Sequence, residues 1–89
     1  MREILLDGRK LEEKTKAQDY LKERFSFPAY YGNNLDALYD CLTEISDDVK
    51  VTVRLFEEGK PYTEKILHVL RDAAQDNEKL DLIIETAGK

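Results

Sequence analysis

The 89-residue chain lacks the residues on which several classes of protein depend. Its single cysteine, Cys41, can form neither an internal disulfide nor a cysteine-rich zinc site, which fits a reducing compartment. No apolar run exceeds three residues, so no stretch can cross a bilayer or serve as the hydrophobic region of a signal peptide. We therefore expect a cytoplasmic protein with no membrane partner.

Signals of catalysis are equally scarce. The four glycines form no phosphate-binding loop, and no serine stands in a nucleophile-elbow pattern. The single histidine, His68, shares a helical face with Glu64 and Asp72, which predicts a solvated position without a role. Cys41 falls on the apolar side of a predicted helix, where a small buried hydrophobe is expected. We expect no enzymatic activity and no cofactor.

What remains is one small, highly charged domain that spans residues 1–89, with 42% hydrophobic and 37% charged residues in 10.4 kDa. Period-two and continuous apolar patterns predict three strands, and four-residue apolar spacing predicts three helices. The order β-α-α-β-α-β favours an α/β fold with a three-stranded parallel sheet packed against helices. The predicted strands are residues 2–6, 51–55 and 80–85, and the predicted helices are residues 16–25, the segment from an N-cap at Asn33 or Asn34 to about 44, and residues 62–76.

Local signals refine this prediction at four places. Thr15 followed by Gln18 has the spacing of a capping box at the start of the first helix. In the loop of residues 26–33, Gly32 permits a positive φ. Gly59 and Pro61 are expected to break the chain before the third helix, and residues 86–89 to form a frayed tail.

The net charge of −5 is concentrated in one segment. Between Arg24 and Lys50 there is no basic residue, but there are five of the 19 acids, so the remaining 14 acids match the 14 bases. Four-residue spacing places Asp36 and Asp40 on one helical face without a local cation. A net negative charge argues against a nucleic-acid partner.

Tyrosines lie among these carboxylates. Tyr39 stands beside the pair, and Tyr30 and Tyr31 lie in the loop before it. Aromatic rings interleaved with carboxylates are typical of a surface that docks a basic partner. Two other readings remain open, a merely solvated helix face and a carboxylate site for Mg²⁺ or Ca²⁺.

The segment FPAYYGNNLDALYDCLTE, residues 27–44, closely resembles the signature of the barstar family of intracellular ribonuclease inhibitors. The family pattern is a proline followed by YYG-x-NLDALWDCLT. Tyr39 and Ile45 stand where the family has tryptophans, and Glu44 replaces a small glycine. The proline that precedes the family's second strand is absent. These departures are compatible with a cognate nuclease other than barnase.

The resemblance implies a ribonuclease inhibitor that blocks the active site of a basic, barnase-like ribonuclease. We expect a 1:1 complex, and a monomer when the protein is free. Asp40 would face the phosphate site of the nuclease, and Asp36 would pair with a neighbouring cation. The alternative is an interaction domain of the same fold with a basic partner that is not a nuclease. The residues implied in partner binding are Tyr30, Gly32, Asn34, Leu35, Asp36, Tyr39, Asp40, Thr43, Glu44 and Asp72.

Overall fold

The computed structural model describes residues 1–56 and 60–86. It confirms the predicted order of three strands and three helices and adds a short 3₁₀ helix, η1, after the first strand. Gly59 and residues 87–89 lie outside the described residues, whereas Thr86 is the last residue of a strand and not part of a tail. The elements are β1 (Arg2–Asp7), η1 (Gly8–Leu11), α1 (Lys14–Phe25), α2 (Leu35–Thr43), β2 (Val49–Leu55), α3 (Pro61–Asp76) and β3 (Leu80–Thr86).

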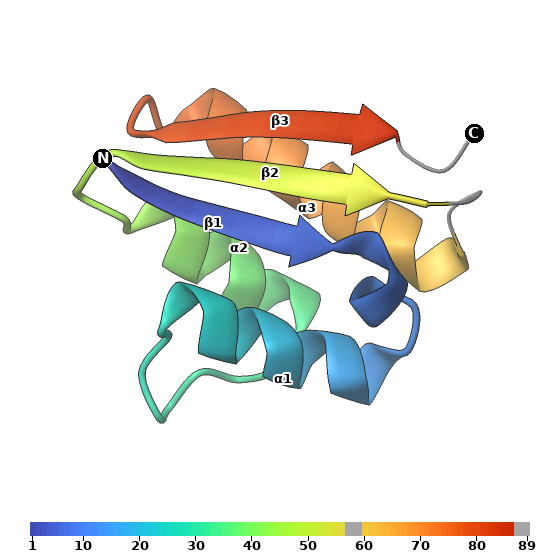
Figure 1. Cartoon of the computed structure of the whole chain (residues 1–89). Coiled ribbons are helices and arrows are strands. Elements are labelled where there is room, and N and C mark those ends of the chain that lie inside the picture. The colour runs from blue at the N-terminus through green and yellow to red at the C-terminus, as the bar shows by residue number, and fades with distance from the viewer. Residues whose placement is uncertain (57–59, 87–89) are drawn as a thin grey trace.

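The three strands form one parallel sheet in the order β1-β2-β3 (Figure 1). The register places Ile4 beside Val51, and Val51 beside Leu82. Parallel neighbours require a crossover between them, and here α1 and α2 connect β1 to β2 while α3 connects β2 to β3. The fold class predicted from the sequence is therefore confirmed.

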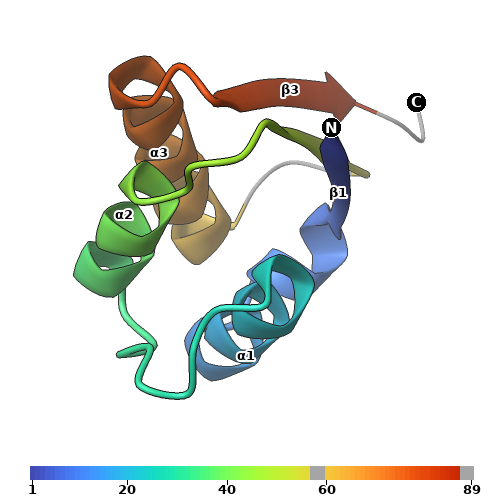
Figure 2. The ribbon, with the colours of Figure 1, turned by 90° about the vertical axis from the view of Figure 1, so that its left-hand side faces the viewer.

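All three α-helices cover the same face of the sheet (Figure 2). Alternate strand residues such as Leu6, Val51 and Val53 point into the core between sheet and helices and are fully buried. Leu5 and Ile83 lie on the opposite face and are exposed. The domain thus has two layers, and the outward sides of the helices are free to carry a site.

The capping box predicted at the start of α1 is wrong. The helix begins at Lys14, and its N-cap residue Glu13 makes no side-chain capping bond. Gln18 instead points into the core, where it is buried and bonded to two tyrosine hydroxyls. Because those buried hydroxyls need partners, tertiary contacts override the local capping signal.

The loop between α1 and α2 adopts positive φ at Ser26 (58°) and Asn33 (53°), and not at Gly32 as predicted. Asparagine tolerates this conformation, and the Asn33 amide is held by a 3.0 Å bond to Asp19 Oδ1. Gly32 serves a close approach instead, because an added Cβ would lie 3.2 Å from Asn34 Nδ2. Within the described residues, no helix is long and apolar enough to cross a membrane.

Candidate functional site

Helix α2 presents the predicted acidic residues because its apolar residues anchor the opposite side. Asn34 is the N-cap, and its Oδ1 accepts a 2.7 Å bond from the Ala37 amide. Leu38 and Leu42 are fully buried against the rest of the core. With those two positions inside, the helical period turns Asp36 and Asp40 outward, and both are exposed.

Helix α3 lies beside α2 (Figure 2). It adds carboxylates to the same surface. The hydroxyl of Tyr39 on α2 donates a hydrogen bond to Asp76 Oδ2 on α3. This bond raises the pKa of the Tyr39 hydroxyl, and the negative charges of Asp72 and Asp40 add to the increase. Asp40 and Asp72 are therefore near enough to Tyr39 for their charges to act on its hydroxyl. We call Asp36, Tyr39, Asp40, Glu44, Asp72 and Asp76 the acidic surface.

Asp76 was missed by the sequence reasoning, although a signal was present. It follows Asp72 by four residues and therefore lies on the same face of α3. Asp72 itself is 3.3 Å from Nε2 of His68, which is exposed as predicted. That contact is an ion pair only when the histidine is protonated.

Asp36 and Asp40 have no ion-pair partner among residues 1–56 and 60–86. Asp36 lines a hollow of about 330 Å³ together with Lys14 and Lys65, neither of which pairs with it. Leu35, also a predicted contact, is half-buried and lines the same hollow. Carboxylates that stay unpaired in the free protein remain available to external cations.

The loop before α2 exposes one tyrosine and buries the next. Tyr30 is 85% exposed, in agreement with the resemblance, whereas Tyr31 is 6% exposed. Tyr31 donates its hydroxyl to Gln18 Oε1, and Gln18 Nε2 donates to the Tyr62 hydroxyl at 2.7 Å. Burial raises the pKa of the Tyr31 hydroxyl. The ring of Tyr31 also lies 4.7 Å from that of Phe27, which in turn stacks at 5.1 Å on the ring of Phe25 in α1. The loop is therefore anchored to α1 by both polar and aromatic contacts.

The remaining predicted residues serve the local structure as well. Asn34 Nδ2 donates a 3.2 Å bond to the Gly32 carbonyl, which holds the turn into α2. The Thr43 hydroxyl donates a 3.0 Å bond to the Asp40 carbonyl one turn earlier. Glu44 is the exposed C-cap residue of α2. These residues shape the loop and both ends of the helix that carries the carboxylates.

Two alternative chemistries gain no support. Burial raises the pKa of the Cys41 thiol, and the charges of Glu44 and Asp40 add to the increase, so the thiolate is disfavoured. Cys41 is half-buried, less completely than its apolar position predicted. In the part of the chain that the structure describes, no group of three or more His, Cys, Asp or Glu residues is arranged to hold a metal ion.

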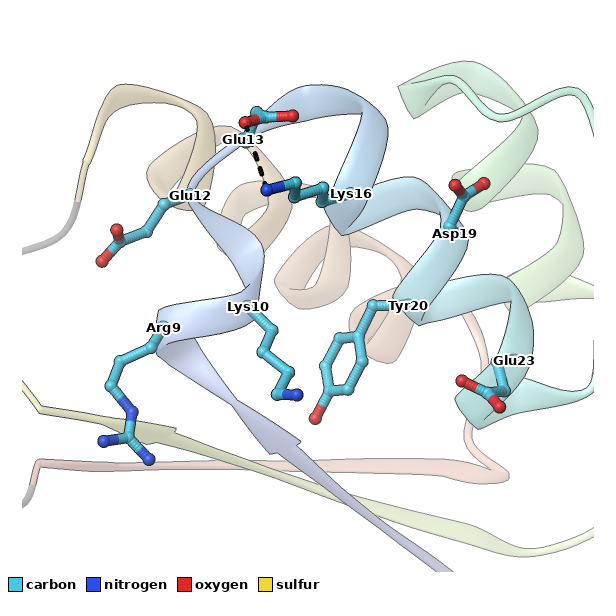
Figure 3. A pocket seen from close by; sticks show the side chains of 8 residues that line it. All are labelled: Arg9, Lys10, Glu12, Glu13, Lys16, Asp19, Tyr20 and Glu23. Atoms are coloured by element: carbon cyan, nitrogen blue, oxygen red, sulfur yellow. Dashed lines mark ion pairs between the residues drawn. The ribbon is translucent and has the colours of Figure 1, made fainter.

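A hollow of about 490 Å³ lies between η1 and α1 (Figure 3), and none of its lining residues belongs to the acidic surface. Its walls mix cations such as Lys10 with carboxylates such as Glu23, and Lys16 lies 4.0 Å from Glu13. None of the predicted site residues lines it. A helical surface that docks a protein needs no such cavity, so the acidic surface is kept as the candidate site.

Comparison with known proteins identifies the family. The sequence matches the family described as "Barstar (barnase inhibitor)" over residues 1–86. It is also 37% identical over 91 residues to the Bacillus subtilis (strain 168) protein named "Putative ribonuclease inhibitor YrdF", covering 96% of this chain and all of the relative. Both matches span nearly the whole of the domain that carries the acidic surface, and the chain belongs to the barstar family.

Proposed function

We propose that this protein inhibits a small basic ribonuclease by inserting the acidic surface into the active site of the nuclease. A ribonuclease binds RNA phosphates with cationic side chains, and carboxylates held at similar spacing compete for the same cations. The protein then acts by occupying the site, without a catalytic step, in a 1:1 complex. Its lone thiol suits the cytoplasm, where an inhibitor protects the producing cell.

The observation that carries the proposal is a pair of exposed carboxylates, Asp36 and Asp40, to which the described residues supply no ion-pair partner. Both are exposed on one face of α2, and neither has an ion pair within the described residues. Like charges at four-residue spacing destabilise a helix by about 0.2–0.5 kcal/mol. The arrangement costs the free protein stability, and a cationic partner would reverse that cost.

Exposed aromatic area supports a protein partner over a small anion-binding ligand. Tyr30 projects from the loop, and the half-buried ring of Tyr39 lies among the carboxylates of α2 and α3. Tyrosine contributes a large contact area with little loss of side-chain entropy. Tyr39 stands where the family signature has tryptophan, so the surface that meets the nuclease differs at this position from the family pattern.

The test is RNA cleavage by a panel of small basic microbial ribonucleases, barnase included, with and without this protein. We expect stoichiometric inhibition of at least one member and loss of that inhibition in Asp40→Ala. The matched control is Asp81→Ala, which removes an exposed carboxylate from the uncovered face of the sheet. Equal inhibition by Asp40→Ala would contradict the proposed surface, and binding only to a basic protein that is not a nuclease would favour the alternative function.

A further inference from the structure

The last residues of α3 and the segment after it hold the C-terminal end of α2. Asn77 is the C-cap of α3 and is buried. Its Nδ2 donates 3.0 Å bonds to the carbonyls of both Leu42 and Ile45 and lies 3.5 Å from the carbonyl of Thr43. The side-chain amide of Asn77 therefore contacts three carbonyls at and just after the C-terminal end of α2, the helix that carries Asp40.

The other side of the same amide is fixed to the start of β3. Asn77 Oδ1 accepts a 3.0 Å bond from the Lys79 amide, and the Asn77 carbonyl accepts a 3.0 Å bond from Leu80. Because β3 pairs with β2 along its length, Asn77 ties the end of α2 to the sheet. Both the Nδ2 donor and the Oδ1 acceptor of the Asn77 side chain make hydrogen bonds, so these bonds determine the orientation of the amide.

The end of α2 needs such a contact. Terminal carbonyls of a helix have no partner within the helix, and α2 has no basic residue in its last turn to offset them. A lysine or arginine there would satisfy the carbonyls but would place a positive charge beneath Asp40 and Glu44. A neutral amide donates the same hydrogen bonds and leaves the negative potential of the acidic surface intact.

We propose that Asn77 is the positioning residue for the partner-binding helix: it fixes the end of α2, and with it the orientation of Asp40 and Glu44, without adding charge. The inference rests on the proposed function for the identity of the partner, although the fixing of α2 is a property of the free protein. A helix already held in its docking orientation loses less conformational entropy when the complex forms.

The diagnostic variant is Asn77→Asp, which has nearly the same shape. Aspartate can still accept from the Lys79 amide, but when ionised it cannot donate to the α2 carbonyls. Its control is Leu11→Ala, which removes a fully buried side chain of η1 and opens a cavity in the core. Because η1 follows the C-terminal end of β1 and α2 ends just before β2 begins, the two sites lie at opposite ends of the parallel sheet (Figure 1).

The experiment measures amide hydrogen exchange in the free variants and their affinity for the panel ribonuclease that the wild type inhibits most strongly. In Asn77→Asp we expect amide hydrogen exchange to accelerate at residues 42–45, by a factor at least tenfold larger than the acceleration in α1. We also expect the affinity for the ribonuclease to fall at least tenfold, at a temperature where the variant stays folded. Leu11→Ala should bind within about twofold of the wild type. Equal acceleration in the two variants, or an unchanged affinity of Asn77→Asp, would overturn the role of Asn77. A wild type that inhibits no ribonuclease contradicts the proposed function instead, and the exchange comparison still decides whether Asn77 holds α2.

Discussion

The hydroxyl of Tyr39 on α2 donates a hydrogen bond to the carboxylate of Asp76 on α3. The bond crosses between the two helices that together form the acidic surface, and it lies next to Asn77, which holds the end of α2. Asp76, the last residue of α3, therefore holds α2 through the Tyr39 side chain. The next residue, the cap Asn77, holds the carbonyls at the end of α2. The acidic surface is therefore held in place in the free protein, which would lower the entropic cost of binding a partner.

The bond between Tyr39 and Asp76 predicts energetic coupling between the helices. In a double-mutant cycle of Tyr39→Phe and Asp76→Ala, each single change should lower the free energy of unfolding, and the double change should cost less than the sum. Urea unfolding of the four proteins measures the coupling. Strict additivity would show that the hydrogen bond does not contribute in solution.

Asp40 should contribute to binding and not to folding. Asp40→Asn removes a charge that repels Asp36, so the melting temperature should stay unchanged or rise slightly. In the complex it leaves a desolvated cation of the nuclease unpaired, which costs on the order of 3–5 kcal/mol. Calorimetric melting and binding titrations measure the two effects, with Asp81→Asn as the control of equal charge change. A marked fall in melting temperature with unchanged affinity would assign Asp40 to the fold.

The acidic surface should also steer association. Exposed charges are screened with a Debye length of about 8 Å at physiological ionic strength, against about 30 Å at 0.01 M. The association rate constant with a basic nuclease should therefore fall steeply over this range while the dissociation rate constant changes little. Stopped-flow mixing measures the association rates. Association that is independent of salt would exclude steering by Asp36 and Asp40.

Buried Tyr31 predicts a loss of stability in alkali. The hydroxyl ionises near pH 10 in the unfolded chain, but burial raises its pKa in the folded protein. Above pH 10 the folded state therefore binds more protons than the unfolded state, and the free energy of unfolding falls as pH rises. Tyr31→Phe should make this decline shallower by up to about 1.4 kcal/mol per pH unit. Urea unfolding between pH 9 and 11 measures the slope.

The control for that prediction is Tyr30→Phe, which removes a hydroxyl from the exposed ring of the adjacent tyrosine. This variant keeps the buried Tyr31 hydroxyl and should therefore retain the alkaline slope of the wild type. A slope that is the same in all three proteins would mean that the Tyr31 hydroxyl reaches solvent in the folded state.

The sequence predicted the fold well because its strongest signals are local and periodic. The alternation of Val51 and Val53 and the four-residue spacing of Leu38 and Leu42 correspond to buried faces in the structure. Such patterns report which side of an element is apolar, and packing follows from that. The exposure of Asp36 and Asp40 could be predicted for the same reason.

The parts that the sequence could not predict depend on contacts distant along the chain. Gln18 has the spacing of a capping residue, but Tyr31 and Tyr62 recruit it into the core from other elements. Asn77 looks like an ordinary helix stop, yet its amide bonds to carbonyls more than 30 residues earlier. A local sequence pattern does not show hydrogen-bond partners that lie far apart along the chain and meet only in the folded protein.

The central claim is that the acidic surface occupies the active site of a ribonuclease. Its most direct test is a calorimetric titration of this protein into the inhibited ribonuclease, first alone and then with a mononucleotide saturating the active site. We predict that the apparent affinity falls in proportion to the concentration of mononucleotide, because both ligands need the same cations. An affinity that is unchanged by the mononucleotide would contradict the account and place the protein elsewhere on the nuclease.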